Sequence, residues 1–348
     1  MYSDSDLDAA VSAGAITPEA AEAFRRYVAQ SRQTQAADEE HFRLLTGFND
    51  IFVSIAIALI LIAVIWIGRA TSPTLAAAGI VVTSWGLAEF FTRRRRMALP
   101  SILLLLAYTF ASWLCAFNLL CRLVYHGDEA MPWAIELLHM ARWPTVAATA
   151  VTTAMVYAHW RRFMVPITIA AGVAALLTTV LLAIFMMVPA LRQDEMVLLL
   201  IAGLCVFGIA MHWDASDVAR RTRRSDVAFW LHLMAAPMVV HPAFALLGLL
   251  GGGAIGPGRA VAVILIYLAL GLLALAIDRR ALLVSALAYV LTAMSTLFKA
   301  AGSAGFSFAL TALIIGSLLL VLSAFWHTAR RPVMAALPPG LRARLPAV

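Results

Sequence analysis

Ten long apolar stretches follow one another between residues 50 and 326, separated by short polar turns. Each is long enough to cross the roughly 30 Å hydrocarbon core of a bilayer as a helix. The chain is 63% hydrophobic and only 13% charged, and a soluble protein could not bury so much apolar surface in one core. The sequence therefore predicts an all-α polytopic transmembrane bundle. The ten predicted spans are 50–67, 74–91, 98–121, 144–160, 164–189, 195–213, 227–250, 259–277, 281–298 and 304–326.

The placement of basic residues predicts the orientation of these spans. If the N-terminus lies in the cytoplasm and the spans alternate, 20 of the 26 basic residues fall in cytoplasmic segments. Short loops rich in Lys and Arg stay on the cytoplasmic side of a membrane. We therefore expect a multi-pass protein of the inner (cytoplasmic) membrane with both termini inside.

The chain divides into three regions. Residues 1–46 are predicted to form a cytoplasmic helical hairpin, followed by a polar linker and an amphipathic lead-in, because Gly14 suits a helix end and Thr17 with Pro18 suits a helix start. Residues 47–327 form the transmembrane domain, and 328–348 form a cytoplasmic tail. Residues 1–40 are a candidate docking surface for a cytoplasmic protein partner.

The opening "LDAAVSAGAITPEAAEAF" resembles the N-terminal signature of a bacterial membrane-protein family known only as a domain of unknown function. The resemblance covers the first 50 residues and a few short segments. It implies a small cytoplasmic helical pair followed by many spans joined by arginine turns. It implies no activity, cofactor or site.

The seventh predicted span, "SDVAFWLHLMAAPMVVHPAF", holds two histidines and two prolines. Ionisable groups in hydrocarbon are costly and therefore mark candidate functional sites. His232 and His241 are nine residues apart and point to opposite sides of a straight helix. Pro237 and Pro242 could kink the helix and bring the two rings together. The histidines could handle protons or a substrate, bind haem or a metal, or each donate a hydrogen bond to a neighbouring helix.

Two further ionisable residues are binding or proton-handling candidates. Glu89 lies near the inner end of the second span, where it could pair with the following "RRRR" or act as a coupling carboxylate. Lys299 lies near an outer helix end, where it could reach the membrane surface or meet an anionic substrate.

No sequence pattern indicates a catalytic site, a metal site, a bound cofactor or nucleic-acid binding. Similar arginine hairpins end at Tyr108 and Tyr289. They are explained either by an internal duplication, as many transporters have, or by the general likeness of any two hairpins with an arginine turn. The favoured interpretation is a secondary transporter or permease for a small solute or ion, with proton coupling as one way to drive it. The alternatives are a membrane scaffold or sensor whose N-terminal hairpin docks a partner, a haem-bearing redox protein, and an enzyme acting within the bilayer.

Overall fold

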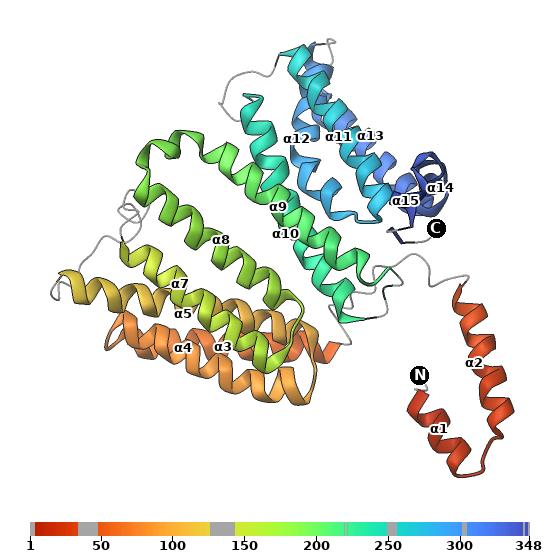
Figure 1. Cartoon of the computed structure of the whole chain (residues 1–348), viewed down its shortest axis with the longest axis horizontal. Helices are drawn as coiled ribbons and strands as arrows, with labels where there is room; N and C mark the ends of the chain where they lie inside the picture. The colour runs from red at the N-terminus through yellow and green to blue at the C-terminus, as the bar shows by residue number, and fades with distance from the viewer. Residues whose placement is uncertain are drawn as a thin grey trace. The chain divides into compact units, whose positions relative to one another are not determined.

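The computed structural model describes residues 4–33, 48–125, 143–218, 220, 222–248, 256–300, 305–343 and 345–346. All secondary structure in these residues is helical (Figure 1). The chain forms two compact units, Met1–Phe42 and Arg43–Val348. Residues 34–47, which include most of the predicted linker and most of the amphipathic lead-in, lie outside the described residues.

The first unit holds two helices, α1 (Asp4–Ser12) and α2 (Pro18–Gln33). Gly14 follows α1 with a φ of 68°, a conformation that glycine adopts without steric cost. At the start of α2, the hydroxyl oxygen of Thr17 accepts a hydrogen bond from the amide of Ala20 at 3.2 Å. The first helix therefore ends, and the second begins, where the sequence pattern places them.

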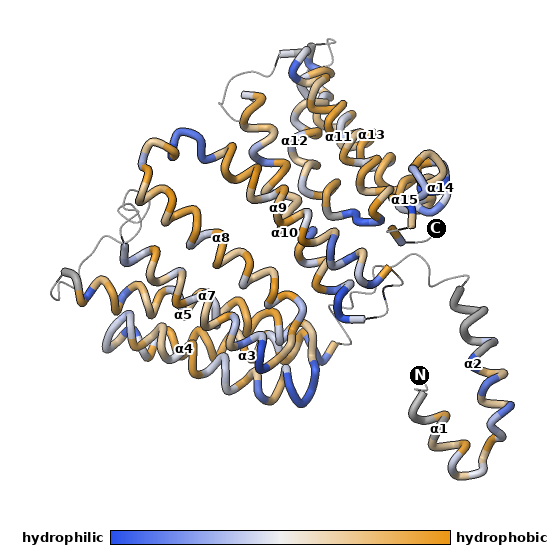
Figure 2. The backbone as a smooth tube through the Cα atoms, viewed as in Figure 1, coloured by the Kyte–Doolittle hydropathy of each residue, from blue (hydrophilic) through white to orange (hydrophobic). Residues whose placement is uncertain are grey.

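The second unit contains the apolar helices of the chain. Their hydrophobic middles and polar turns alternate along the backbone (Figure 2). The elements are α3 (Phe48–Arg69), α4 (Pro73–Ala88), the π-helix η1 (Glu89–Arg94), α5 (Ala98–Tyr125), α7 (Trp143–Phe163), α8 (Ile167–Met187), the 3₁₀-helix η2 (Pro189–Asp194), α9 (Glu195–Ala215), α10 (Arg223–Leu246), α11 (Pro257–Ile277), α12 (Ala281–Ala300), α13 (Ser307–Ala324), α14 (Trp326–Ala336) and α15 (Pro339–Arg342).

Nine helices among the described residues are long and apolar enough to cross a membrane. They correspond to nine of the ten predicted stretches, so the chain is a multi-pass helical membrane protein. The remaining stretch, 144–160, forms α7, which is 21 residues long but less apolar than the nine. Its threonines use their hydroxyls within the helix: Thr149, Thr152 and Thr153 each donate to the carbonyl four residues earlier.

Short turns join several helices on the side that the sequence assigns to the cytoplasm. Four non-glycine residues have positive φ among the described residues: Arg96, Met164, Arg220 and Asp278. Three lie in turns that the sequence assigns to the cytoplasm, and Met164 directly follows such a turn as the first residue of a predicted span. A left-handed residue after the last helical turn ends a helix abruptly. The tight turns therefore coincide with the arginine-rich segments.

Helices α9 and α10 approach each other closely at Gly203. A Cβ on Gly203 would lie 2.7 Å from the carbonyl carbon and oxygen of Met238. Pro242 lacks the N–H that would otherwise bond to the Met238 carbonyl within α10. The glycine therefore brings α9 against a carbonyl that α10 itself leaves without its usual donor. A core cluster that includes Ala170, Val206 and Leu231 joins α8 to this pair.

Candidate functional site

Helix α10 runs without interruption from Arg223 to Leu246, although Pro237 and Pro242 lie inside it. Thr222 starts the helix, because its hydroxyl oxygen accepts a hydrogen bond from the amide of Arg224 at 3.2 Å. Neither proline breaks the helix. His232 and His241 therefore project from one continuous element.

His232 is fully buried and faces α9. Its Nε2 lies 3.0 Å from Oδ2 of Asp214, in the last turn of α9, and both side chains are at most 4% exposed. The ring of Phe207 packs edge-on against the imidazole, with ring centroids 5.3 Å apart. The other ring nitrogen, Nδ1, is buried and has no hydrogen-bond partner in the described part of the chain. A nitrogen in that situation suits a bare lone pair better than an N–H, because an unpaired buried donor is costly.

Arg279 completes this group from the turn between α11 and α12. Its Nη2 donates to Oδ1 of Asp214 at 2.5 Å and its Nε donates to Oδ2 at 3.2 Å. Nη2 also donates to the carbonyl of Ser225 at 3.2 Å, which ties the turn to the start of α10. We call Asp214, His232 and Arg279 the buried triad. A carboxylate at a helix C-terminus faces an unfavourable dipole, and the paired guanidinium offsets that cost.

A second polar layer lies beside the buried triad. Asp278 receives hydrogen bonds from Nη1 of Arg220 at 2.8 Å and from the indole N–H of Trp326 at 2.7 Å. Burial acts to raise the pKa of Asp278, but the charge of Arg220 and the hydrogen bond from Trp326 outweigh it and hold that pKa below its usual value. The Asp278 carboxylate is therefore ionised at neutral pH.

Arginines also bond to the carbonyls at the C-terminal end of α11. Arg330 of α14 is fully buried and donates to the carbonyls of Leu275 at 2.9 Å, Ala276 at 3.4 Å and Pro346 at 2.6 Å. Arg220 donates to the carbonyl of Ile277 at 3.2 Å. The last carbonyls of a helix have no partner within it, and here guanidinium groups supply the missing donors. The C-terminal segment, to which the sequence assigned no structure, is thus fixed against α11.

His241 lies in a separate environment. Its Nδ1 is 2.6 Å from the hydroxyl of Tyr289 on α12, and the Tyr289 ring also packs against Phe244. The two histidines of α10 therefore have different partners on different helices, and the structure does not bring their rings into one site.

Glu89 lies far from the buried triad in the sequence, at the start of η1. It forms a bidentate ion pair with Arg162 of α7, at 2.6 and 3.0 Å, and a weaker contact with Arg93 at 3.2 Å. The side chains of Arg162 and Glu89 are 43% and 31% exposed. Lys299 is exposed in the last turn of α12.

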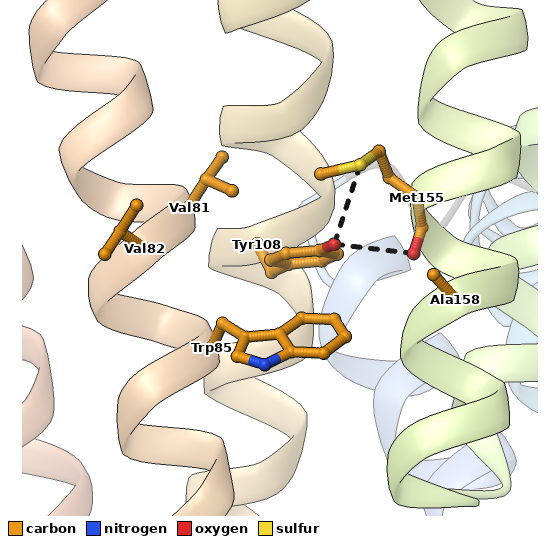
Figure 3. Close-up of a pocket in the computed structure, with 6 residues that line it drawn as sticks. All are labelled: Val81, Val82, Trp85, Tyr108, Met155 and Ala158. Carbon is orange, nitrogen blue, oxygen red and sulfur yellow. Dashed lines mark hydrogen bonds between the residues drawn. The ribbon is translucent and has the colours of Figure 1, made fainter.

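A pocket of about 380 Å³ opens between α4, α5 and α7 (Figure 3). Its lining is aliphatic, aromatic and thioether: Val81, Val82, Trp85, Tyr108, Met155 and Ala158. The Tyr108 hydroxyl points at Met155, 3.5 Å from its carbonyl oxygen and 3.8 Å from its sulfur. We call this pocket the Trp85 groove.

An aromatic cluster adjoins the Trp85 groove. The buried ring of His159 lies 5.4 Å from Tyr108, 6.1 Å from Trp85 and 4.5 Å from Phe163, centroid to centroid. Its Nδ1 is 3.4 Å from the hydroxyl of Thr168 on α8. His159 was not among the residues singled out from the sequence, although a histidine within a predicted span is a usable signal.

Sequence reasoning also missed Asp214, Arg279, Asp278 and Arg330. Asp214 and Asp278 each lie at the C-terminal end of a helix, where a negative charge is unfavourable. That position was the available sequence signal that each aspartate has a cationic partner. Among the described residues, no three His, Cys, Asp or Glu side chains gather as a metal site would require. Comparison with protein-family models, curated proteins and solved structures found no match.

Proposed function

We propose that the chain is a proton-coupled permease that crosses the cytoplasmic membrane ten times, with both termini inside. Helix α7 would be the tenth span. Its 21 residues measure roughly 31 Å, which matches the hydrocarbon thickness. This threading also places all four tight arginine-rich turns on one side, in agreement with the positive-inside rule.

The observation that carries the proposal is the buried triad. Carboxylates and histidines in membrane proteins form proton relays in pumps and transporters. The triad sets His232 of the seventh predicted span against Asp214, which directly follows the sixth. Here the pair joins α9 to α10 directly, and Arg279 links both helices to the turn between α11 and α12. A change of charge at His232 therefore acts on four helices at once.

The contacts of His232 support a neutral resting imidazole. With the proton on Nε2, the ring donates to Asp214 and leaves Nδ1 as an unprotonated acceptor. A second proton would reside on Nδ1, which has no hydrogen-bond partner among the residues that the structure describes. It would also add a positive charge beside Arg279, which already neutralises the carboxylate. Protonation is therefore favourable only if the site rearranges or admits water or solute, and that requirement would couple proton uptake to a conformational change.

The test uses the full chain in liposomes loaded with a pH-sensitive dye. A panel of amino acids, sugars, carboxylates and organic cations is added outside under an inward proton gradient. We expect at least one solute to accelerate proton entry. His232→Asn retains a side chain that can donate to Asp214 but cannot take up a proton, so it should abolish the solute-dependent component.

His241→Asn is the matched control, because it alters the other histidine of the same helix. Solute-dependent proton entry should persist in this variant. If no solute accelerates proton entry, or if the His232→Asn protein folds and behaves as wild type, the proton-coupled mechanism is wrong.

A second candidate function is a membrane scaffold or sensor. It is favoured by the N-terminal segment, Met1–Phe42, which forms a compact unit of its own. Deletion of residues 1–40 distinguishes the two candidates. A permease lacking this unit should still move solute and protons, whereas a scaffold should lose a partner that the full chain recovers by crosslinking in cells.

A further inference from the structure

The Trp85 groove suits an apolar ligand. Its lining offers carbon and sulfur surfaces, and the one hydroxyl among the lining residues, on Tyr108, is turned towards Met155. Val82 is 72% exposed, so the groove opens at the outer surface of the helices that form it. In a membrane protein that surface faces lipid, and the adjacent hydrocarbon chains are the apolar groups available to enter.

An ion pair lies one helical turn from the groove, towards the arginine-rich ends of α4 and α7. Glu89 follows Trp85 by four residues, and Arg162 follows Ala158 by four residues. Four helical residues span about 6 Å. Glu89 and Arg162 are bonded to each other, so their pair joins α4 to α7 on the arginine-rich side of the groove.

Positive charge dominates beyond that pair. Arg93, Arg94, Arg95 and Arg96 end the α4 segment, and Arg161 and Arg162 end α7; all six are exposed. Glu89 is the acidic residue within these two segments. Basic pockets between transmembrane helices on the cytoplasmic side bind anionic lipid headgroups.

The backbone is unusual at this end of the groove. Helix α4 continues into the π-helix Glu89–Arg94, in which the amide of Arg95 bonds to the carbonyl of Phe90, five residues earlier. π-Helical turns are rare and occur frequently at functional sites. This widened turn carries Glu89 and Arg93 together, at the junction between the apolar groove and the arginines.

We propose that the Trp85 groove and the adjacent arginines form a binding site for an anionic phospholipid. One acyl chain lies in the groove against Val82 and Trp85, and the phosphate is held at Arg93 and Arg161. The bidentate Glu89–Arg162 pair separates the two parts of the site and fixes α4 against α7. The inference does not depend on proton coupling, because the buried triad belongs to α9–α12 and this site belongs to α4, α5 and α7.

Native mass spectrometry of the delipidated full-length protein tests the site. The probes are phosphatidylglycerol and phosphatidylcholine with the same acyl chains. We expect tighter binding of phosphatidylglycerol. The double substitution Arg93→Gln with Arg161→Gln should weaken its binding by about fivefold for each arginine removed, with little effect on phosphatidylcholine.

Val82→Trp fills the groove from its exposed side and should remove the bound phosphatidylglycerol. Val284→Trp on α12 is the matched control, since Val284 is similarly exposed at 68% but lies elsewhere. Arg192→Gln in η2 is the control for loss of an exposed charge. Each variant is compared with wild type in a thermal melt to verify that it is folded.

Equal affinity for the two lipids, unchanged in the arginine variant, would overturn the headgroup assignment in favour of an uncharged occupant. Wild-type binding of phosphatidylglycerol by Val82→Trp would overturn the groove assignment.

Discussion

The buried triad and the Glu89–Arg162 pair use the same chemistry in different surroundings. Each sets a carboxylate near the end of a helix against an arginine from another element. In the triad, Asp214 and Arg279 are 4% and 3% exposed, whereas Glu89 and Arg162 are 31% and 43% exposed. Exposed ion pairs contribute little to stability because water solvates both partners well. Buried pairs leave an uncompensated charge when one partner is removed.

Burial, more than the pairing itself, decides what each cluster does. The buried triad is a fixed junction of four helices, and its disruption should affect the whole second unit. The exposed pair lies beside further exposed arginines, which suits contact with a lipid headgroup. Substitutions of buried and exposed polar side chains test this difference between the two clusters.

Asp214→Ala should produce the largest loss of stability. It leaves the charge of Arg279 buried without a carboxylate, which costs about 3–5 kcal/mol in the free energy of unfolding. Unfolding by SDS titration in mixed micelles measures the change. Adding Arg279→Met should recover part of the loss, because no unpaired charge then remains. A double variant as unstable as the sum of its two single variants would show that the two side chains are not coupled.

Arg330→Met should release the C-terminal segment from α11. The substitution removes the donors to the carbonyls of Leu275, Ala276 and Pro346, and we expect a loss of about 2 kcal/mol or more. Hydrogen exchange should then rise throughout α14 and at the end of α11. Arg331→Met, at the exposed neighbouring position, is the control and should leave exchange unchanged. Equal protection in the two variants would contradict the role assigned to Arg330.

Asp278→Asn should flatten the acid limb of the stability profile. The pKa of Asp278 is lower in the folded protein than the unfolded value of about 4. Its ionised form therefore stabilises the fold fully above about pH 4, and this contribution is lost as the pH falls through the lower folded value. Melting temperatures between pH 2 and 7 should accordingly depend less on pH in the variant. Asp194→Asn, at an exposed position, should retain the wild-type profile.

Glu89→Gln should have the smallest effect on stability. The residue is partly exposed and its partners Arg93 and Arg162 can be solvated, so the melting temperature should match that of wild type within error. A destabilisation comparable to that of Asp214→Ala would remove the distinction between the two clusters.

Hydrophobic runs and arginine turns were sufficient to predict nine of the apolar helices, because both signals are local in sequence. The span count depends on α7, whose threonines lower its hydropathy while bonding to their own helix. The pairing of Glu89 with "RRRR" was predicted in part: Arg93 is a partner, but the shorter contacts come from Arg162, 73 residues away. Such a partner is specified by helix packing and has no local signal.

The buried triad could not be predicted from the sequence for the same reason. His232 was identified from the sequence, but Asp214 and Arg279 are separated from each other by 65 residues and were assigned to cytoplasmic turns. They meet because α9 packs against α10 and the turn after α11 places Arg279 beside both helices. His159 was overlooked because the stretch around it is dominated by threonine and alanine.

The most direct test of the central claim is ¹⁵N NMR of the full-length protein, labelled at its eight histidines and embedded in lipid nanodiscs. The His232 signal is identified as the one missing from His232→Asn. The account predicts a neutral ring at pH 7, protonated on Nε2 and bare at Nδ1, and a changed Nε2 signal in Asp214→Asn. An imidazolium at pH 7, or a neutral ring protonated on Nδ1, would contradict it.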